Sequence, residues 1–138
     1  MGTDNYYSVK EDVQKYIDGC KTKMNVRTHK VFGRAVLAGM MIAFGASASN
    51  VAAHAVTNVG LSRLVAGCVF PVGLMMVVLL GAELFTGDCL MAMGNAEGAC
   101  TILDLIKFLF VVYVGNFVGS ILLAVLDGGI LLLAHQEG

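Results

Sequence analysis

The chain has 138 residues, of which 57% are hydrophobic and 14% are charged, and its mean hydropathy is +0.78. Soluble globular domains contain about 25% charged residues, so this composition excludes an ordinary soluble domain and indicates a membrane protein. The net charge of −1 conceals an asymmetry, because seven of the nine Lys and Arg residues lie within the first 34 positions. Acidic residues are interleaved with these cations, so the basic end is not predicted to bind nucleic acid.

The cysteine spacing and the side-chain chemistry argue against a metal centre or an enzyme. The four cysteines are far apart, with no CxxC motif and no Cys/His cluster, so neither a metal site nor a disulfide framework is predicted. Cys68 and Cys89 lie in apolar runs, and we expect both to be buried as small hydrophobic side chains. No nucleophile–base pair is apparent, so no enzymatic activity and no bound cofactor are predicted.

Residues 1–30 are predicted to form a polar cytoplasmic segment around one amphipathic helix. Ser8 is followed three residues later by Glu11, the arrangement of a capping box. Apolar side chains recur at intervals of three and four residues from Val9 to Cys20, which gives the helix one apolar stripe. Either this helix lies on the membrane interface or against a neighbouring subunit, or it is an ordinary solvated helix. No cleavable signal peptide is predicted, because the first apolar run begins only after about 30 residues.

Residues 31–138 are predicted to form a transmembrane region with three spans, at about 31–56, 63–93 and 101–133. Each contains an uncharged run of 19–21 residues, close to the ~20 residues with which a helix crosses a bilayer. The first run ends in the small and polar residues Gly45–Asn50, which predict close packing inside a helix bundle. The positive-inside rule places the basic N-terminus in the cytoplasm.

The second span is predicted to be broken. The apolar stretch over residues 64–93 is about ten residues too long for one crossing, and the octapeptide Gly81–Asp88 interrupts it. Two carboxylates, a hydroxyl and two glycines do not suit a lipid-facing helix, and an ionisable residue at membrane depth marks a candidate functional site. We predict a helix kinked at Pro71, a break over residues 81–88, and a half-helix capped by Asp88, with Gly87 easing the turn.

The third span is predicted to start at Thr101 and to break at Asp127–Gly129. Gly115 and Gly119 form a GxxxG pattern, which favours a close helix crossing. Asn116 lies near mid-depth of this span. It either bonds to a neighbouring backbone as a structural link or takes a direct part in a pathway.

Four sequence blocks carry a resemblance to a known family, and they occur in the family's order. They are Ala38-Gly39 with Gly45-Ala46, Phe70-Pro71-Val72-Gly73-Leu74, Gly81-Ala82-Glu83-Leu84-Phe85-Thr86-Gly87, and Tyr113-Val114-Gly115-Asn116-Phe117-Val118-Gly119. The chain resembles the formate/nitrite transporters over nearly its whole length. Within that family it looks most like the hydrosulfide channel branch.

The resemblance implies an all-α integral membrane fold in which this chain is one inverted-repeat half. Members have an aquaporin-like fold of six transmembrane helices in two inverted repeats of three, and they assemble as homopentamers with one pore per subunit. The second repeat supplies its own broken helix and a central pore histidine. None of His29, His54 and His135 stands in that motif, so the C-terminal repeat is expected as a partner.

The resemblance also implies roles for individual pore residues. Phe70 and Leu74 match the constriction on the cytoplasmic side, and Leu84 and Phe85 match positions at the external constriction. Thr86 matches the threonine whose hydroxyl meets the central histidine. The alternative for the four apolar residues is ordinary packing within the bundle.

Four further residues are expected to support the loop. Gly87 and Asp88 match the loop whose movement has been proposed as a gate in the family. Glu83 is interpreted as a structural carboxylate bonded to loop amides, because a fixed anion in the pathway would repel an anionic substrate. Asn116 completes this group as a link between helices.

The resulting hypothesis is the N-terminal half of a channel-like carrier for small monovalent anions, with hydrosulfide, formate and nitrite as candidates. The alternative is a three-span membrane protein with a structural or regulatory role and no transport activity. The expected location is a prokaryotic inner membrane, with the chain crossing it several times from a cytoplasmic N-terminus.

Overall fold

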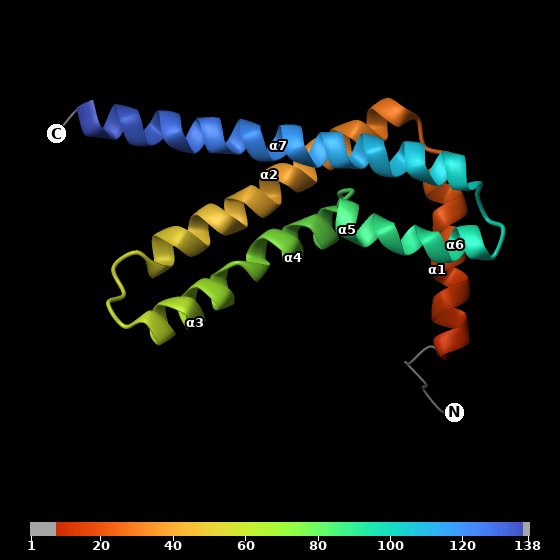
Figure 1. Ribbon diagram of the computed structural model, residues 1–138, viewed down its shortest axis with the longest axis horizontal. Coiled ribbons are helices and arrows are strands. Elements are labelled where there is room, and N and C mark those ends of the chain that lie inside the picture. The colour runs from red at the N-terminus through yellow and green to blue at the C-terminus, as the bar shows by residue number, and fades with distance from the viewer. Residues whose placement is uncertain (1–7, 137–138) are drawn as a thin grey trace.

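A computed structural model describes residues 8–136, with side chains to residue 130, and this part of the chain is helical without a β-strand. The helices follow one another with short connections, and the two ends of the described chain lie at opposite ends of the molecule (Figure 1). The helices are α1 (Val9–Met24), α2 (Thr28–Ala53), α3 (Val59–Val69), α4 (Pro71–Leu80), α5 (Phe85–Asp88), the 3-10 helix η1 (Cys89–Met91), α6 (Ala92–Ala96) and α7 (Ile102–Gln136).

Three helical segments are long and apolar enough to cross a membrane: Thr28–Ala53, Val59–Leu80 and Ile102–Ile130. The prediction of an all-helical membrane protein with three spans is therefore confirmed at this level. The second segment joins α3 and α4 at Phe70, where Pro71 begins α4 without a backbone N–H. Only 11% of its most apolar window is buried within the chain, so most of this segment faces lipid or other protein.

The α2 and α7 helices form the closest contact of the bundle. They run side by side over the right-hand half of Figure 1. Small residues make this possible: a Cβ atom on Gly119 would overlap the carbonyl oxygen of Val36, and one on Gly39 would overlap that of Asn116. A Cβ atom on Gly115 would likewise lie 2.5 Å from that of Ala35. The GxxxG prediction is thus confirmed, since the missing side chains allow the two helices to approach this closely.

The second half of α2 packs on the other side against α3 and α4. The Ser49 hydroxyl donates to the carbonyl oxygen of Ala66 at 3.1 Å, and a Cβ atom on Gly45 would lie 2.9 Å from the carbonyl oxygen of Phe70. Both Gly45 and Ser49 are buried. The small, polar end of the first span therefore packs closely in the bundle, as its composition predicts.

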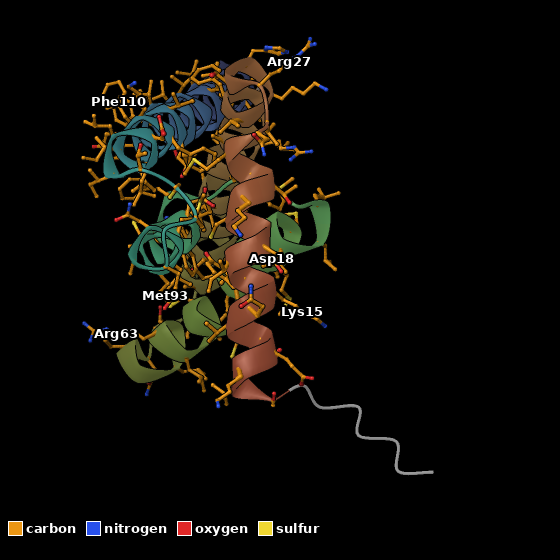
Figure 2. All side chains as sticks on the ribbon, turned by 90° about the vertical axis from the view of Figure 1, so that its right-hand side faces the viewer. Lys15, Asp18, Arg27, Arg63, Met93 and Phe110 are labelled. Carbon is orange, nitrogen blue, oxygen red and sulfur yellow. The ribbon has the colours of Figure 1, made fainter. Side chains whose placement is uncertain are left out.

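The α1 helix stands nearly perpendicular to α7 at one end of the molecule (Figure 1). Ser8 and Glu11 form the predicted capping box, in which the Ser8 amide donates to Glu11 Oε2 at 2.8 Å. Cys20 is 2% exposed and packs with Met91 and Leu105 in one hydrophobic cluster. The opposite face of α1, which carries Lys15 and Asp18, turns away from the bundle (Figure 2).

Two sequence predictions outside the interruption are wrong. The α7 helix continues through Asp127–Gly129 without a break. Glycine often ends helices in water, but a backbone in an apolar environment must keep its internal hydrogen bonds. Asp127 is accommodated because its carboxylate accepts a hydrogen bond from the Ser47 hydroxyl.

Cys68 and Cys89 are exposed on this chain rather than buried, because they lie on the poorly covered second segment and the half-helix after it.

Candidate functional site

The site is the interruption between α4 and α5, where the backbone is not helical over residues 81–84. Gly81 ends α4 in the left-handed conformation, with φ 61° and ψ 36°, which costs a glycine little. The Ala82 amide then donates back to the Val77 carbonyl oxygen at 3.0 Å, as in a Schellman motif. Leu84 is extended, and helical structure resumes at Phe85.

The structure corrects the predicted start of the half-helix. A helical run from Phe85 to Ala96 passes through α5, η1 and α6, so it begins three residues before Asp88. Leu84 occupies the N-cap position, and its own apolar side chain forms no capping hydrogen bond. The left-handed residue of the break is Gly81, whereas Gly87 lies in the helix without a positive φ. Asp88 forms an ion pair instead of a cap.

Asn116 holds both edges of the interruption. Its Nδ2 donates to the carbonyl oxygen of Glu83 at 2.9 Å and to that of Ala35 on α2 at 2.8 Å. Its Oδ1 accepts from the amide of Phe85 at 2.9 Å. One side chain thus satisfies the last free carbonyl before α5, the first amide of α5, and a carbonyl of α2. A broken helix at membrane depth needs such partners. These contacts agree with the alternative in which Asn116 is a structural link to neighbouring backbone.

A cluster of charges lies beside the interruption. The Lys23 ammonium of α1 donates to Glu83 Oε2 at 2.5 Å and to Asp88 Oδ1 at 2.7 Å. Arg34 Nη1 lies 3.8 Å from Glu83 Oε1. Glu83 and Asp88 are 3% and 2% exposed, so their charges depend on these cations rather than on water.

Burial alone would lower the pKa of Lys23, but the hydrogen bonds to Asp88 and Glu83 outweigh it and raise the pKa above its usual value. Lys23 therefore stays charged and binds the two carboxylates together. The second oxygen of Asp88, Oδ2, has no hydrogen-bond partner among the described residues. A second link from α1 comes from Tyr16, whose hydroxyl donates to the Gly87 carbonyl oxygen at 3.2 Å.

Sequence reasoning missed these partners. Glu83 was expected to bond to loop amides, but its side chain bonds to Lys23 and lies near Arg34. Local sequence patterns do not identify Glu83 as the partner of Lys23, because the pairing spans 60 residues of sequence. The helix spacing carries one signal: Lys23 lies three residues after the buried Cys20, so both side chains are on the same side of α1.

The predicted constriction residues fall into two groups. Phe70 and Leu74 are 44% and 48% exposed, and Thr86 is also exposed. Leu84 is half-buried against the cluster that contains Val77. Phe85 is half-buried too, and its ring meets that of Tyr113 edge-on at a centroid distance of 5.5 Å. Phe70, Leu74 and Thr86 are thus exposed on the surface of this chain. Leu84 and Phe85 are instead partly buried in contacts with other side chains.

Comparison with known proteins identifies the type of chain in which this interruption occurs. Residues 10–135 match the model of the formate/nitrite transporter family. The chain belongs to this family. It is therefore a multi-pass membrane protein of a family of transporters, and the predicted family is confirmed.

Several relatives are similar to this chain in sequence. A probable formate transporter from Methanothermobacter thermautotrophicus is 43% identical over 100 residues, which cover 69% of this chain and 36% of that protein. A formate-nitrite transporter from Entamoeba histolytica is 40% identical over 73% of this chain and 29% of its own length. The formate channel FocA from Haemophilus influenzae is 39% identical over 74% of this chain and 37% of its own length. The chain thus matches about a third of the length of these relatives.

Proposed function

We propose that this chain is the N-terminal three-helix half of a channel or carrier for small monovalent anions. The observation that carries the proposal is the interrupted second span, held open by Asn116, in a chain of the formate/nitrite transporter family. Interrupted hydrophobic segments are the usual location of a transporter's binding site. Formate and nitrite are the first candidates, because the relatives carry these names.

The chemistry around the interruption fits a weak-acid anion. Apolar residues such as Phe70 and Leu74 remove water from a passing ion, which is costly for a fully ionised species. The exposed hydroxyl of Thr86, next to the interruption, offers a hydrogen bond that offsets part of this cost. Because Lys23 and Arg34 together balance the charges of Glu83 and Asp88, an anion at Thr86 meets little repulsion. Leu84 and Phe85 are proposed as the outer constriction.

The proposed assembly contains more than this chain. The second repeat, with the other broken helix and the central histidine, would cover the exposed side of α3 and α4 and face Thr86. Five such subunits would form a pentamer in a prokaryotic inner membrane. The N-terminus would lie in the cytoplasm, because seven of the nine cations precede residue 35. Hydrosulfide is a further candidate substrate, which rests on the sequence resemblance to that branch.

Flux into proteoliposomes tests the proposal. The native assembly that contains this chain is reconstituted, and uptake of formate, nitrite and hydrosulfide is compared with that of protein-free vesicles. We expect uptake of at least one of the three anions well above the vesicle background. A folded, membrane-inserted assembly that passes none of them contradicts the proposal and favours a three-span structural or regulatory protein.

A further inference from the structure

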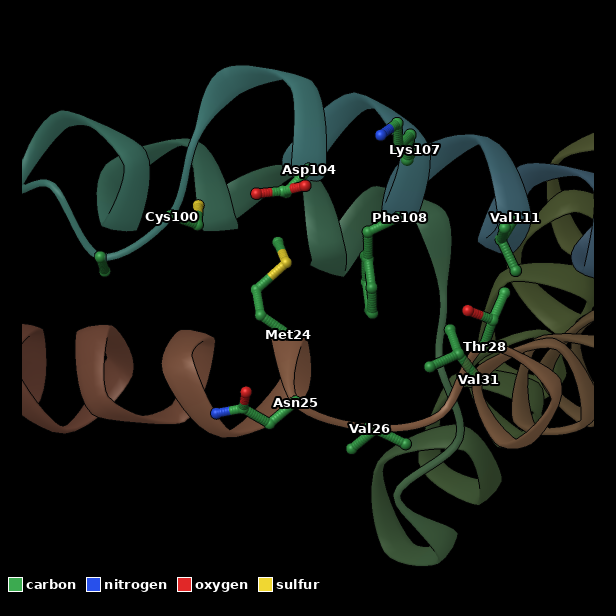
Figure 3. A pocket seen from close by; sticks show the side chains of 11 residues that line it. Met24, Asn25, Val26, Thr28, Val31, Cys100, Asp104, Lys107, Phe108 and Val111 are labelled. Carbon is green, nitrogen blue, oxygen red and sulfur yellow. The ribbon is translucent and has the colours of Figure 1, made fainter.

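A cavity of about 460 Å³, lined by no residue of the interruption, lies between the α1–α2 corner and the start of α7 (Figure 3). Thr28 begins α2 here, and α7 begins nearby at Ile102. Two membrane-crossing segments therefore start beside this cavity, which places it at the level where a bilayer changes from acyl chains to headgroups. Its walls are mixed, with charged, polar and apolar side chains.

The charged residues of the cavity are one anion and one cation. Asp104 and Lys107 are three residues apart on α7, so they lie on the same side of the helix. Asp104 Oδ2 accepts a hydrogen bond from the Thr101 hydroxyl at 2.6 Å, which leaves its other oxygen for a ligand. Among the described residues Lys107 forms no ion pair. Met24 and Asn25 form the facing wall (Figure 3).

A second, apolar groove of about 560 Å³ lies beside the cavity, along α2 and α7. The two spaces share Thr28 and Val111. Phe32 and Phe110 line the groove and are 37% and 67% exposed. Figure 2 shows Phe110 projecting outward from α7. A polar cavity with Asp104 and Lys107 thus adjoins a groove that is apolar except for Thr28 and His29.

We propose that this space binds a phospholipid whose zwitterionic headgroup carries a primary amine. The phosphate pairs with Lys107, the ammonium donates to Asp104, and one acyl chain lies in the groove against Phe32 and Phe110. Charge complementarity selects this headgroup class. A purely anionic headgroup would leave Asp104 facing negative charge, and a quaternary amine would offer it no N–H donor.

Cys100 provides a direct probe, because its half-buried side chain lines the cavity. The protein in detergent is alkylated with a maleimide in the presence of phosphatidylethanolamine, phosphatidylcholine or phosphatidylglycerol, and labelling is measured by peptide mass spectrometry. At a lipid concentration about ten times its Kd, roughly a tenth of the sites stay free, so labelling of Cys100 should slow about tenfold. A cysteine introduced by Lys21→Cys, at an exposed position of α1 outside the cavity, serves as the internal control for the labelling rate.

Two variants separate the headgroup from the chain. Asp104→Asn keeps an oxygen for Thr101 but removes the charge, and it should weaken protection by phosphatidylethanolamine about tenfold, the loss of one charge-assisted hydrogen bond. Phe110→Ala should weaken the protection of Cys100 by all three lipids. Phe117→Ala should leave that protection unchanged, because Phe117 is 60% exposed on α7 and lies outside the groove. The proposal is overturned if phosphatidylglycerol protects Cys100 as well as phosphatidylethanolamine does, or if no lipid protects it.

Discussion

Between α2 and α7 the backbones touch through glycines, whereas the interruption at residues 81–88 is bridged by a few polar side chains. Gly39 and Gly119 let the two long helices meet over a continuous surface. The interruption instead depends on Asn116 and on the Lys23 ion pairs. The close-packed α2–α7 pair positions the side chain of Asn116. That side chain in turn fixes the backbone on both sides of the interruption.

The glycine contact is expected to be the most sensitive to substitution. Gly119→Ala places a methyl group against the backbone of α2 and should lower the free energy of unfolding by about 3 kcal/mol, the upper range for overpacking. Thermal unfolding of the detergent-solubilised protein measures the loss. Gly128→Ala is the matched control, because a Cβ atom there meets nothing within 4 Å and alanine favours a helix by about 1 kcal/mol. Equal stability of the two variants would contradict the close-packed interface.

The ion pairs should come next. Lys23→Met leaves Glu83 and Asp88 buried without their shared cation, and we expect a loss of about 2–3 kcal/mol, reduced from the fully buried case because Lys23 is partly exposed. Lys21→Met, an exposed position on the same helix, should have little effect. Adding Asp88→Asn to Lys23→Met should restore part of the stability by removing one unpaired charge. A double variant no more stable than Lys23→Met would rule out this cluster as the cause.

The smallest loss is expected at Asn116. Its three hydrogen bonds contribute roughly 0.6 kcal/mol each in a membrane bundle, so Asn116→Ala should cost just under 2 kcal/mol and also impair flux by freeing both edges of the interruption. Ser120→Ala lies one turn further on and removes a hydroxyl bonded only to the carbonyls of Gly39 and Asn116. This control should retain flux. If Asn116→Ala transports as well as Ser120→Ala does, the interruption is maintained by other contacts.

Local signals in the sequence predicted much of this structure. The capping box at Ser8, the close packing at Gly119 and the interruption after Leu80 each follow from a few neighbouring residues. The linking role of Asn116 was one of two alternatives, and the contacts agree with it. Its particular partners depend on how α2, α5 and α7 meet in space.

The errors arise where tertiary contact outweighs local preference. Asp88 looks like a helix cap in the sequence, yet it lies inside the first turns of the half-helix because Lys23 binds its carboxylate. The glycine pair after Asp127 looks like a helix end, yet α7 continues because an apolar environment offers its backbone no other partners. The pairing of α1 with the interruption joins residues 60 and 65 positions apart, beyond any periodic pattern.

The most direct test of the proposed pathway is anion flux through Thr86→Ala in proteoliposomes, with thermal stability measured on the same sample. Thr86 is exposed beside the interruption, and no side-chain hydrogen bond of its hydroxyl is found within residues 8–130. The substitution should therefore change formate or nitrite flux while leaving the unfolding temperature unaltered. Thr22→Ala on the exposed face of α1 is the control and should change neither. Unaltered flux for every anion in Thr86→Ala would contradict a pathway past the interruption.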